Sequence, residues 1–490
     1  MFRIVEGDTA GLADAEEFVD TLGALDRHPV EPARRLFDRA GDLIVARAPG
    51  RLDVMGGIAD YSGSLVLQLP IREAALVALQ ESPERVLRIV SLGRERQSPP
   101  VRSFELPLSE FETGGSAAAY DAVRASLARD PNTHWASYVA GIFLVLMREQ
   151  GVQFPRGARL LVDSRVPQGK GVSSSAALEV ATLSAVAAWR DLKIEPREIA
   201  LLCQKAENLV VGAPCGVMDQ MTSACGKANR LLALLCQPAE LHGHVPIPDG
   251  IVIAGLDSGV RHAVTGAAYS DVRTGAFMGY RIIAGLAKLK VHPSQRNGVV
   301  KIDDPEWRGY LANVPVTEFD KSFAPRLPEK LSGAEFLTRY RGTTDPVTHV
   351  HPDKKYAVKT PTRHPIHENF RVGTFAELLH AELDDSRMRA LGELMYQSHA
   401  SYSACGLGEP RTDLIVQMCR QAGPEHSVFG AKITGGGSGG TVALLASGSR
   451  GAIEQIAADY ERETGYAPHQ FWGSSPGAAE FGTLRLRSAA

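Results

Sequence analysis

A glycine- and serine-rich segment that runs directly into a helical pattern constrains the fold of this chain most strongly. It reads VPQGKGVSSSAALEVATL over residues 166–183, and its apolar residues recur three and four apart within a predicted helix over 173–189. Backbone N–H groups at a helix start have no partner inside the helix, and that end favours an anion. One serine suffices as a cap, so three consecutive serines indicate a phosphate-binding loop over residues 169–175.

Two further segments place glycines where the chain bends or approaches a ligand closely. In ARAPGRLDVMGGIADYSGS (residues 46–64), a predicted strand over 42–48 ends at Pro49-Gly50 and presents Arg51. A hairpin with a surface arginine is the alternative interpretation. In AKITGGGSGGTVALL (residues 431–445), five glycines within six positions lie between two strand-like segments and permit very close approach of the backbone to a ligand or another loop.

Other readings of these motifs fit less well. GKGVSS lacks the third glycine of the dinucleotide-binding GxGxxG pattern, and the sequence contains no GxxxxGK[ST] loop. GGSGG at 436–440 matches the GxSxG motif of serine hydrolases, but a predicted strand follows it where that motif needs a helix. The sequence therefore favours a phosphate-binding protein of another class.

Composition excludes several classes of function. The 490 residues carry 53 Lys plus Arg against 56 Asp plus Glu, a net charge of −3, which gives no basic field for nucleic acid or an anionic membrane. The apolar runs are too short or interrupted to span a bilayer, and the acidic N-terminal segment lacks a secretory pattern, so a cytoplasmic protein is expected. Six cysteines without a CxxC pair indicate reduced thiols.

Helix and strand patterns are mixed along the chain without a regular βα repeat, which predicts an α+β protein. Residues 1–40 have the pattern of a short helical extension. From about 291 to 371, prolines and charges are frequent and apolar periodicity is weak, which indicates an irregular inserted arm before helices resume at Phe375.

The three glycine-rich segments, in this order, resemble the GHMP small-molecule kinases, and the segments at 46–64 and 431–445 resemble the galactokinase branch. GAPCGVMDQMTSACG (212–226), DSGVRHAVTGAAYSDVR (257–273) and RHPIHENFRV (363–372) are similar to the kinase portion of plant arabinokinases. The resemblance implies a two-lobed fold: a ribosomal-protein-S5-like N-terminal lobe over 41–245 and a ferredoxin-like C-terminal lobe over 246–490 that includes the arm. It also implies ATP and a sugar bound between the lobes.

The resemblance assigns roles to individual residues. It implies that Asp219 orients or deprotonates the sugar hydroxyl and that Arg51 stabilises the charge of the transferred phosphoryl group. It implies magnesium ligands at Glu207 and at one serine of the loop, with Ser174 preferred over its two neighbours. An exposed helix glutamate is the alternative interpretation of Glu207. The implied nucleotide-binding residues are Gly169, Lys170, Gly171, Val172, Ser173, Ser174, Ser175, Gly436 and Gly437.

The implied sugar pocket departs from the galactokinase pattern at one place. Galactokinases read GEHTDY where this chain reads GGIADY, so Gly57 and Ile58 replace a glutamate and a histidine expected to serve the exocyclic hydroxymethyl group. L-Arabinose lacks that group and keeps the ring configuration of galactose. An unpartnered buried pair would cost about 1–3 kcal/mol per group, so the replacement suits the smaller sugar. The full set of implied sugar-binding residues is Asp53, Gly57, Ile58, Asp60, Gly216 and Tyr269.

The sequence thus predicts an ATP- and magnesium-dependent sugar 1-kinase that converts L-arabinose to β-L-arabinose 1-phosphate. A galactokinase, a galacturonokinase and a kinase-like sugar sensor without turnover are the alternatives. Expected partners are a small-molecule sugar and ATP, with no nucleic acid and no membrane, and the expected state is a monomer or weak homo-oligomer.

Overall fold

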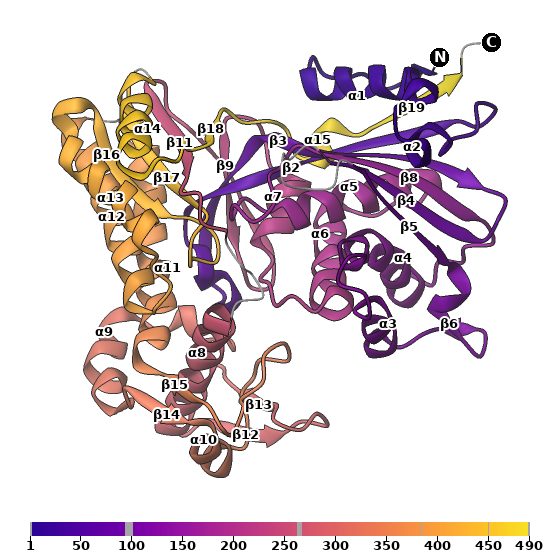
Figure 1. Cartoon of the computed structure of the whole chain (residues 1–490). Coiled ribbons are helices and arrows are strands. Elements are labelled where there is room, and N and C mark those ends of the chain that lie inside the picture. Colours follow the sequence, from indigo (N-terminus) through magenta and orange to yellow (C-terminus); the bar gives the residue numbers. More distant parts are fainter. Residues whose placement is uncertain (1, 94–100, 262–266, 383, 449, 489–490) are drawn as a thin grey trace.

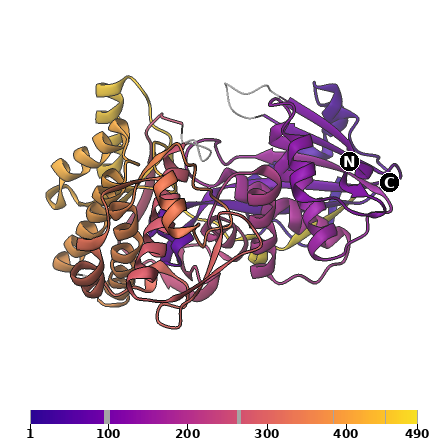
Figure 2. The same cartoon turned by 90° about the horizontal axis from the view of Figure 1, so that it is seen from below.

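Two sheets, one in each lobe, organise the chain, and a third body of short elements lies below them in Figure 1. The computed structural model describes residues 2–93, 101–261, 267–382, 384–448 and 450–488. Figure 2, seen from below, shows the long C-terminal helices on one side and the larger sheet with its helices on the other. This arrangement confirms the predicted two-lobed α+β architecture.

The larger sheet builds the N-terminal lobe and also receives the last strand of the chain. All of its pairs are antiparallel except β4 with β8, and β9 pairs with the first part of β3. The described strands of this sheet, in spatial order, are β1 (Phe2–Glu6), β19 (Thr483–Ser488), β2 (Leu43–Met55), β3 (Leu65–Ser82), β8 (Gly157–Ser164), β4 (Val86–Leu92) and β5 (Val101–Pro107), with β9 (Arg230–Leu235) and β10 (Glu240–Pro246) beside β3.

Helices cover both faces of this sheet. One face packs against α4, α5, α6 and α7 through a large apolar core, whereas α1 covers the opposite face with Phe18 and Leu22. A short hairpin, β6 (Glu112–Thr113) and β7 (Ser116–Ala117), precedes α3. The helices of this lobe are α1 (Ala13–Gly23), α2 (Glu31–Arg34), α3 (Tyr120–Leu127), α4 (Ser137–Glu149), α5 (Ser174–Trp189), α6 (Pro196–Lys205), α7 (Met218–Cys225) and α15 (Ala478–Phe481).

The prediction for residues 1–40 is partly wrong. The segment contains α1, as expected, but it begins with β1, which pairs with β19 and so joins the N-terminal residues to the last described strand (Figure 1). The sequence FRIVE is too short to identify a strand by apolar alternation, and its pairing partner lies more than 470 residues away.

The C-terminal lobe is a four-stranded antiparallel sheet covered by helices. The core between them contains Ile415, Leu444 and Tyr460. Among the described residues, the strand order is β16 (Val428–Ile433), β17 (Thr441–Ser447), β11 (Ile251–Asp257) and β18 (Gln470–Trp472), and the helices are α8 (Ala267–Leu286), α11 (Lys359–His380), α12 (Asp385–Ala404), α13 (Pro410–Ala422) and α14 (Gly451–Thr464). Within the described ranges, none of the helices is both long and apolar enough to cross a bilayer.

The arm predicted at 291–371 is not irregular. It has an apolar core of its own around Trp307, Phe319 and Phe336, and its last residues belong to α11, which begins at Lys359. Pro365 lies inside that helix, so this proline of the segment is accommodated in a regular element. The arm elements are β12 (Lys290–Pro293), β13 (Val300–Asp303), α9 (Val316–Glu318), β14 (Lys330–Ser332), α10 (Gly333–Tyr340) and β15 (Lys355–Ala357).

Candidate active site

A cavity of about 350 Å³ collects residues from both lobes. Its lining comes from β2, the loop before α5, residues 213–219, α8 and the glycine loop between β16 and β17. The predicted site residues that line it are Arg51, Ile58, Asp60, Gly169, Gly171, Val172, Ser173, Ser174, Ser175, Glu207, Gly216, Asp219, Tyr269 and Gly436.

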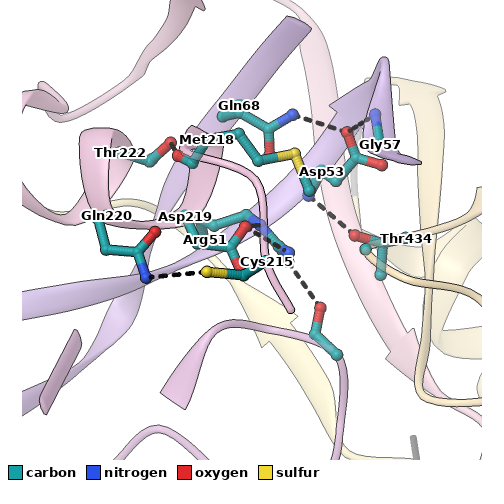
Figure 3. Close-up of polar contacts among 12 residues, drawn as sticks. Arg51, Asp53, Gly57, Gln68, Cys215, Met218, Asp219, Gln220, Thr222 and Thr434 are labelled. Atoms are coloured by element: carbon teal, nitrogen blue, oxygen red, sulfur yellow. Dashed lines mark hydrogen bonds and ion pairs between the residues drawn. The ribbon is translucent and has the colours of Figure 1, made fainter. Parts of the chain in front are cut away.

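A buried arginine and a partly exposed carboxylate face each other in this cavity (Figure 3). Nε and Nη2 of Arg51 both lie 2.8 Å from Oδ1 of Asp219, and Nη1 donates to the carbonyl oxygen of Gly171 at 2.7 Å. Asp219 is 21% exposed and sits in the first turn of α7, where the helix end favours a negative charge. One guanidinium therefore bridges a candidate base and the phosphate-loop backbone.

Arg51 reaches this place because β2 does not end where the sequence analysis placed its end. The strand continues to Met55, and its pairing with β3 shifts register between Pro49 and Arg51. Proline has no N–H to give the ladder, so it is tolerated at such a bulge. A Cβ at Gly50 would lie 2.5 Å from the carbonyl oxygen of Val172, so glycine is required for the strand to pass this close to the serine loop.

The serine loop is held in an unusual backbone conformation. Ser173, directly before α5, has φ +61°, which is rare for a residue with a side chain. Its hydroxyl is buried and has no hydrogen-bond partner among the described residues. Backbone strain of this kind costs about 1–3 kcal/mol and concentrates at ligand sites. The loop thus offers free donors at the start of a 16-residue helix, which is a suitable place for an anion.

Carboxylates gather beside the serine loop. Glu207 lies in a π-helical turn over Ala206–Val211 that continues α6, and it is 3% exposed, which excludes the exposed-glutamate interpretation. Gln220 donates to Glu207 Oε2 at 2.6 Å and to Glu179 Oε2 at 3.2 Å. Burial, and then the charge of Asp219, raise the pKa of Glu207 to about 7. A cation bound here would relieve this electrostatic cost.

One of the three serines contacts the buried glutamate. The Ser175 hydroxyl contacts Glu207 and acts to lower the pKa of that carboxyl. All three serines line the cavity, so Ser175 joins the predicted Ser174 as a candidate ligand beside this carboxylate. In the described part of the chain, no group of three or more His, Cys, Asp or Glu side chains could hold a metal ion. Magnesium commonly takes only one or two protein carboxylates, with phosphates and water completing its shell.

The other end of the cavity contains Asp60, which is 4% exposed. Its Oδ1 is buried without a hydrogen-bond partner among the described residues. A Cβ at Gly216 would lie 1.7 Å from Oδ2 of Asp60, so only glycine permits this approach. Burial, and then the charge of Asp219, raise the pKa of Asp60 to about 7. An unpartnered buried carboxylate oxygen in a cavity is suited to accept a hydroxyl donor from a ligand.

Four predicted site residues do not line the cavity. The Asp53 side chain is fully buried, and the Gly57 N–H donates to its Oδ1 at 3.0 Å (Figure 3). The Lys432 Nζ lies 2.6 Å from its Oδ2. The Lys170 ammonium contacts the buried carboxylate of Asp257 and the Tyr466 hydroxyl, which both belong to the other lobe. Gly437 packs against Leu407 and Tyr402.

Gly57 lies against a buried phenol. A Cβ at this position would lie 1.5 Å from the Tyr402 hydroxyl. That hydroxyl accepts from the Ile58 N–H at 2.8 Å and donates to the Gly435 carbonyl oxygen at 2.9 Å. Tyr402 therefore occupies the space in which any side chain at position 57 would begin, and it joins the first glycine-rich segment to the third.

Sequence reasoning missed about half of the cavity wall. Trp135 and Tyr138 lie in a helical pattern that gives no sign of a binding site. Leu178 lies one helical turn after the serines, and this spacing is the signal that could have indicated it. The segment 213–215 was recognised as part of a motif without being assigned to the site. Residues 262–266 of the DSGVRHAVTGAAYSDVR motif lie outside the described residues. The missed lining residues are Ser91, Arg102, Trp135, Tyr138, Val162, Ser164, Gln168, Leu178, Ala213, Pro214, Cys215, Met218 and Gly435.

The lobes and the site match one family of enzymes. Residues 137–227 match the GHMP kinases N terminal domain, residues 376–467 match the GHMP kinases C terminal domain, and residues 34–81 match the galactokinase galactose-binding signature. The chain therefore belongs to the GHMP kinases.

Individual relatives include an L-arabinokinase and galactokinases. The chain is 46% identical to L-arabinokinase of Arabidopsis thaliana over 99% of its own length, but it spans only 52% of that protein. It is 28% identical to galactokinase of Chloroflexus aggregans, with 82% of this chain and 83% of that protein covered. The crystal structure of Lactococcus lactis galactokinase complexed with galactose superimposes with a TM-score of 0.69 and 20% identity, over 94% of this chain and 99% of that one, which supports the fold.

Proposed function

We propose that this chain transfers the γ-phosphoryl group of ATP to the anomeric hydroxyl of L-arabinose, giving β-L-arabinose 1-phosphate and ADP. The observation that carries the choice of sugar is the contact of Gly57 with Tyr402. The similarity to an L-arabinokinase supports the same choice. A hydroxymethyl group at C5 would find the apolar Ile58 and buried backbone in place of a glutamate and a histidine.

ATP fits along the serine loop. The loop N–H groups and the helix start of α5 suit its phosphates, and Gly435 and Gly436 approach from the other lobe. The aromatic side chains of Trp135 and Tyr138 also line the cavity and are suited to pack against the adenine ring. Lys170 belongs to the same loop, and its ammonium is paired with Asp257.

Glu207 and Ser175 would hold magnesium at the phosphates, since the buried carboxylate and the hydroxyl beside it are hard oxygen donors. The ion, when bound, would neutralise negative charge on the transferred group. Protein side chains would position the sugar hydroxyl, accept its proton and stabilise the transferred charge. Asp219 orients the C1 hydroxyl and accepts its proton, while Arg51, held by Asp219 and Gly171, presents positive charge beside the reacting oxygens.

Asp60 would accept a ring hydroxyl of the sugar, and this gives a prediction for pH dependence. Because the pKa of Asp60 lies at about 7, the acceptor is mostly protonated below that pH. We expect kcat/KM for the sugar, at saturating ATP and magnesium, to fall about tenfold per pH unit below 7 and to level off above it. The inflection should disappear in Asp60→Asn; an unchanged inflection in that variant would show that another group controls sugar binding.

The proposed reaction is tested by its product. Incubation with ATP, magnesium and L-arabinose should release ADP and give a phosphorus resonance coupled to the anomeric proton. Absence of sugar-dependent ADP release, or a phosphate ester at another hydroxyl, would contradict the proposed function.

A further inference from the structure

A loop of the arm is joined by a buried ion pair to an arginine that supports residues of the cavity wall. Asp345 lies in the loop between α10 and β15 and is 1% exposed. Its carboxylate oxygens accept hydrogen bonds from Nε and Nη2 of Arg273, on α8, at 2.8 and 2.9 Å. A two-point pair of this kind fixes a guanidinium in one orientation.

Arg273 contacts two walls of the sugar end of the cavity. Its Nη1 donates to the carbonyl oxygen of Cys215 at 3.2 Å, directly before Gly216. Its guanidinium lies 5.3 Å from the ring centre of Tyr61, which follows Asp60. Tyr61 in turn contacts Tyr269 edge to face, at 6.0 Å between ring centres. One side chain thus supports the segment 213–216 and the segment that contains Asp60.

The two walls are in direct contact where they meet. The Gly216 backbone packs directly on the Asp60 carboxylate, as the 1.7 Å distance from a Cβ at position 216 shows. The positive charge of Arg273 also opposes the rise in the pKa of Asp60. Loss of the Arg273 orientation would therefore move the Cys215 carbonyl and alter both the shape and the charge of the sugar end.

The arm holds Asp345 in place independently of Arg273. The carboxylate accepts from the backbone N–H groups of Val347 and Thr348, at 3.0 and 3.2 Å, and from the Thr348 hydroxyl at 2.7 Å. The same loop is bonded to the β12–β13 hairpin, because the Val300 N–H donates to the Thr343 carbonyl oxygen at 2.8 Å. The position of Asp345 therefore depends on the folded arm.

We infer that Asp345 is a positioning residue for the sugar: through Arg273, the arm holds the two walls of the pocket that meet at Asp60 and Gly216. The identity of the sugar rests on the proposed function, but the location of the effect does not. This assigns the arm a place in substrate binding, although the arm itself contributes no residue to the cavity lining.

The test compares sugar and nucleotide kinetics in Asp345→Asn, which keeps the shape of the side chain and removes its charge. We expect KM for L-arabinose to rise at least about tenfold, with KM for ATP and kcat within about twofold of wild type. Thr348→Val removes one hydrogen bond to Asp345 and should give a smaller rise of about threefold without loss of the ion pair. If Asp345→Asn does not fold, the Thr348→Val variant still tests the role of Asp345.

Asp304→Asn is the matched control. Asp304 is another arm aspartate that accepts from backbone N–H groups, those of Glu306, Trp307 and Gly309, and from the Tyr280 hydroxyl, but it has no contact with Arg273. Its substitution should leave KM for the sugar unchanged even if the melting temperature falls. Equal increases in KM for both aspartate variants would indicate general loosening of the arm and overturn the inference.

Binding of L-arabinose, measured by calorimetry in the presence of ADP, tests the role of Asp345 separately from the proposed function. Weaker binding in folded Asp345→Asn or Thr348→Val, with normal ADP binding, supports the inference. Wild-type binding and KM in these variants overturn the inference and leave the proposed function intact. A wild-type protein that neither binds nor phosphorylates any pentose or hexose overturns both.

Discussion

The Asp219→Asn variant is expected to lose phosphoryl transfer by about 10²–10⁴-fold, because an amide cannot accept the proton of the sugar hydroxyl. Asparagine keeps the shape that Arg51 contacts at Oδ1, so the cavity should remain assembled. The loss should fall on kcat and on kcat/KM together, because the interaction is needed in the transition state.

The measurement is ADP release at saturating ATP and sugar, together with the melting temperature and ADP affinity of the variant. Asp459→Asn is the matched control: Asp459 lies on α14 in a surface ion pair with Arg462, which contributes little. Near-wild-type turnover by Asp219→Asn would require a different base. A folded variant without turnover that still binds ADP agrees with the assigned role.

A single methyl group at position 57 is expected to have an effect of similar size on sugar turnover. In Gly57→Ala the new Cβ would lie 1.5 Å from the Tyr402 hydroxyl, on a backbone with φ +47°. Overpacking and the left-handed conformation together should destabilise the fold by about 2–5 kcal/mol. A displacement of about 1 Å at Ile58 can cost about 10²-fold in kcat/KM for the sugar.

A double-mutant cycle with Tyr402→Phe tests whether contact with the Tyr402 hydroxyl causes the loss of stability in Gly57→Ala. Phenylalanine removes the oxygen nearest to the added methyl group but leaves the Ile58 N–H and the Gly435 carbonyl oxygen without that partner. Tyr402→Phe alone should therefore destabilise the fold by about 1–3 kcal/mol. In urea unfolding, the double variant should lose less free energy of unfolding than the sum of the losses in the two single variants. Strictly additive losses would show that the methyl group does not contact Tyr402.

The parts of the site predicted from sequence are those encoded within one short segment. The serine loop, the helix that follows it and the glycine loop each combine local turn and helix signals, and the structure has each of them. The strand that carries Arg51 was predicted too short, because Pro49 signals a break unless a bulge in the pairing with β3 accommodates it.

The remaining features depend on pairs that are distant in sequence. Tyr402 meets Gly57 from a helix 345 positions later, and Lys432 pairs with Asp53 across 379 positions. The Lys170 ammonium pairs with Asp257, which lies in the other lobe. No local signal reports such contacts. The departure from the galactokinase pattern at Gly57 and Ile58 was visible in the sequence. That Tyr402 fills the space beside Gly57 was not.

The proposed preference for L-arabinose over sugars with a substituent at C5 is tested most directly by three sugars. L-Arabinose, D-fucose and D-galactose share their ring hydroxyl configuration and carry hydrogen, methyl and hydroxymethyl at that carbon. We predict that kcat/KM falls in this order, with D-galactose about 10–100-fold below L-arabinose, because its extra hydroxyl would be buried without a partner beside Ile58. Faster turnover of D-galactose than of L-arabinose would contradict the account.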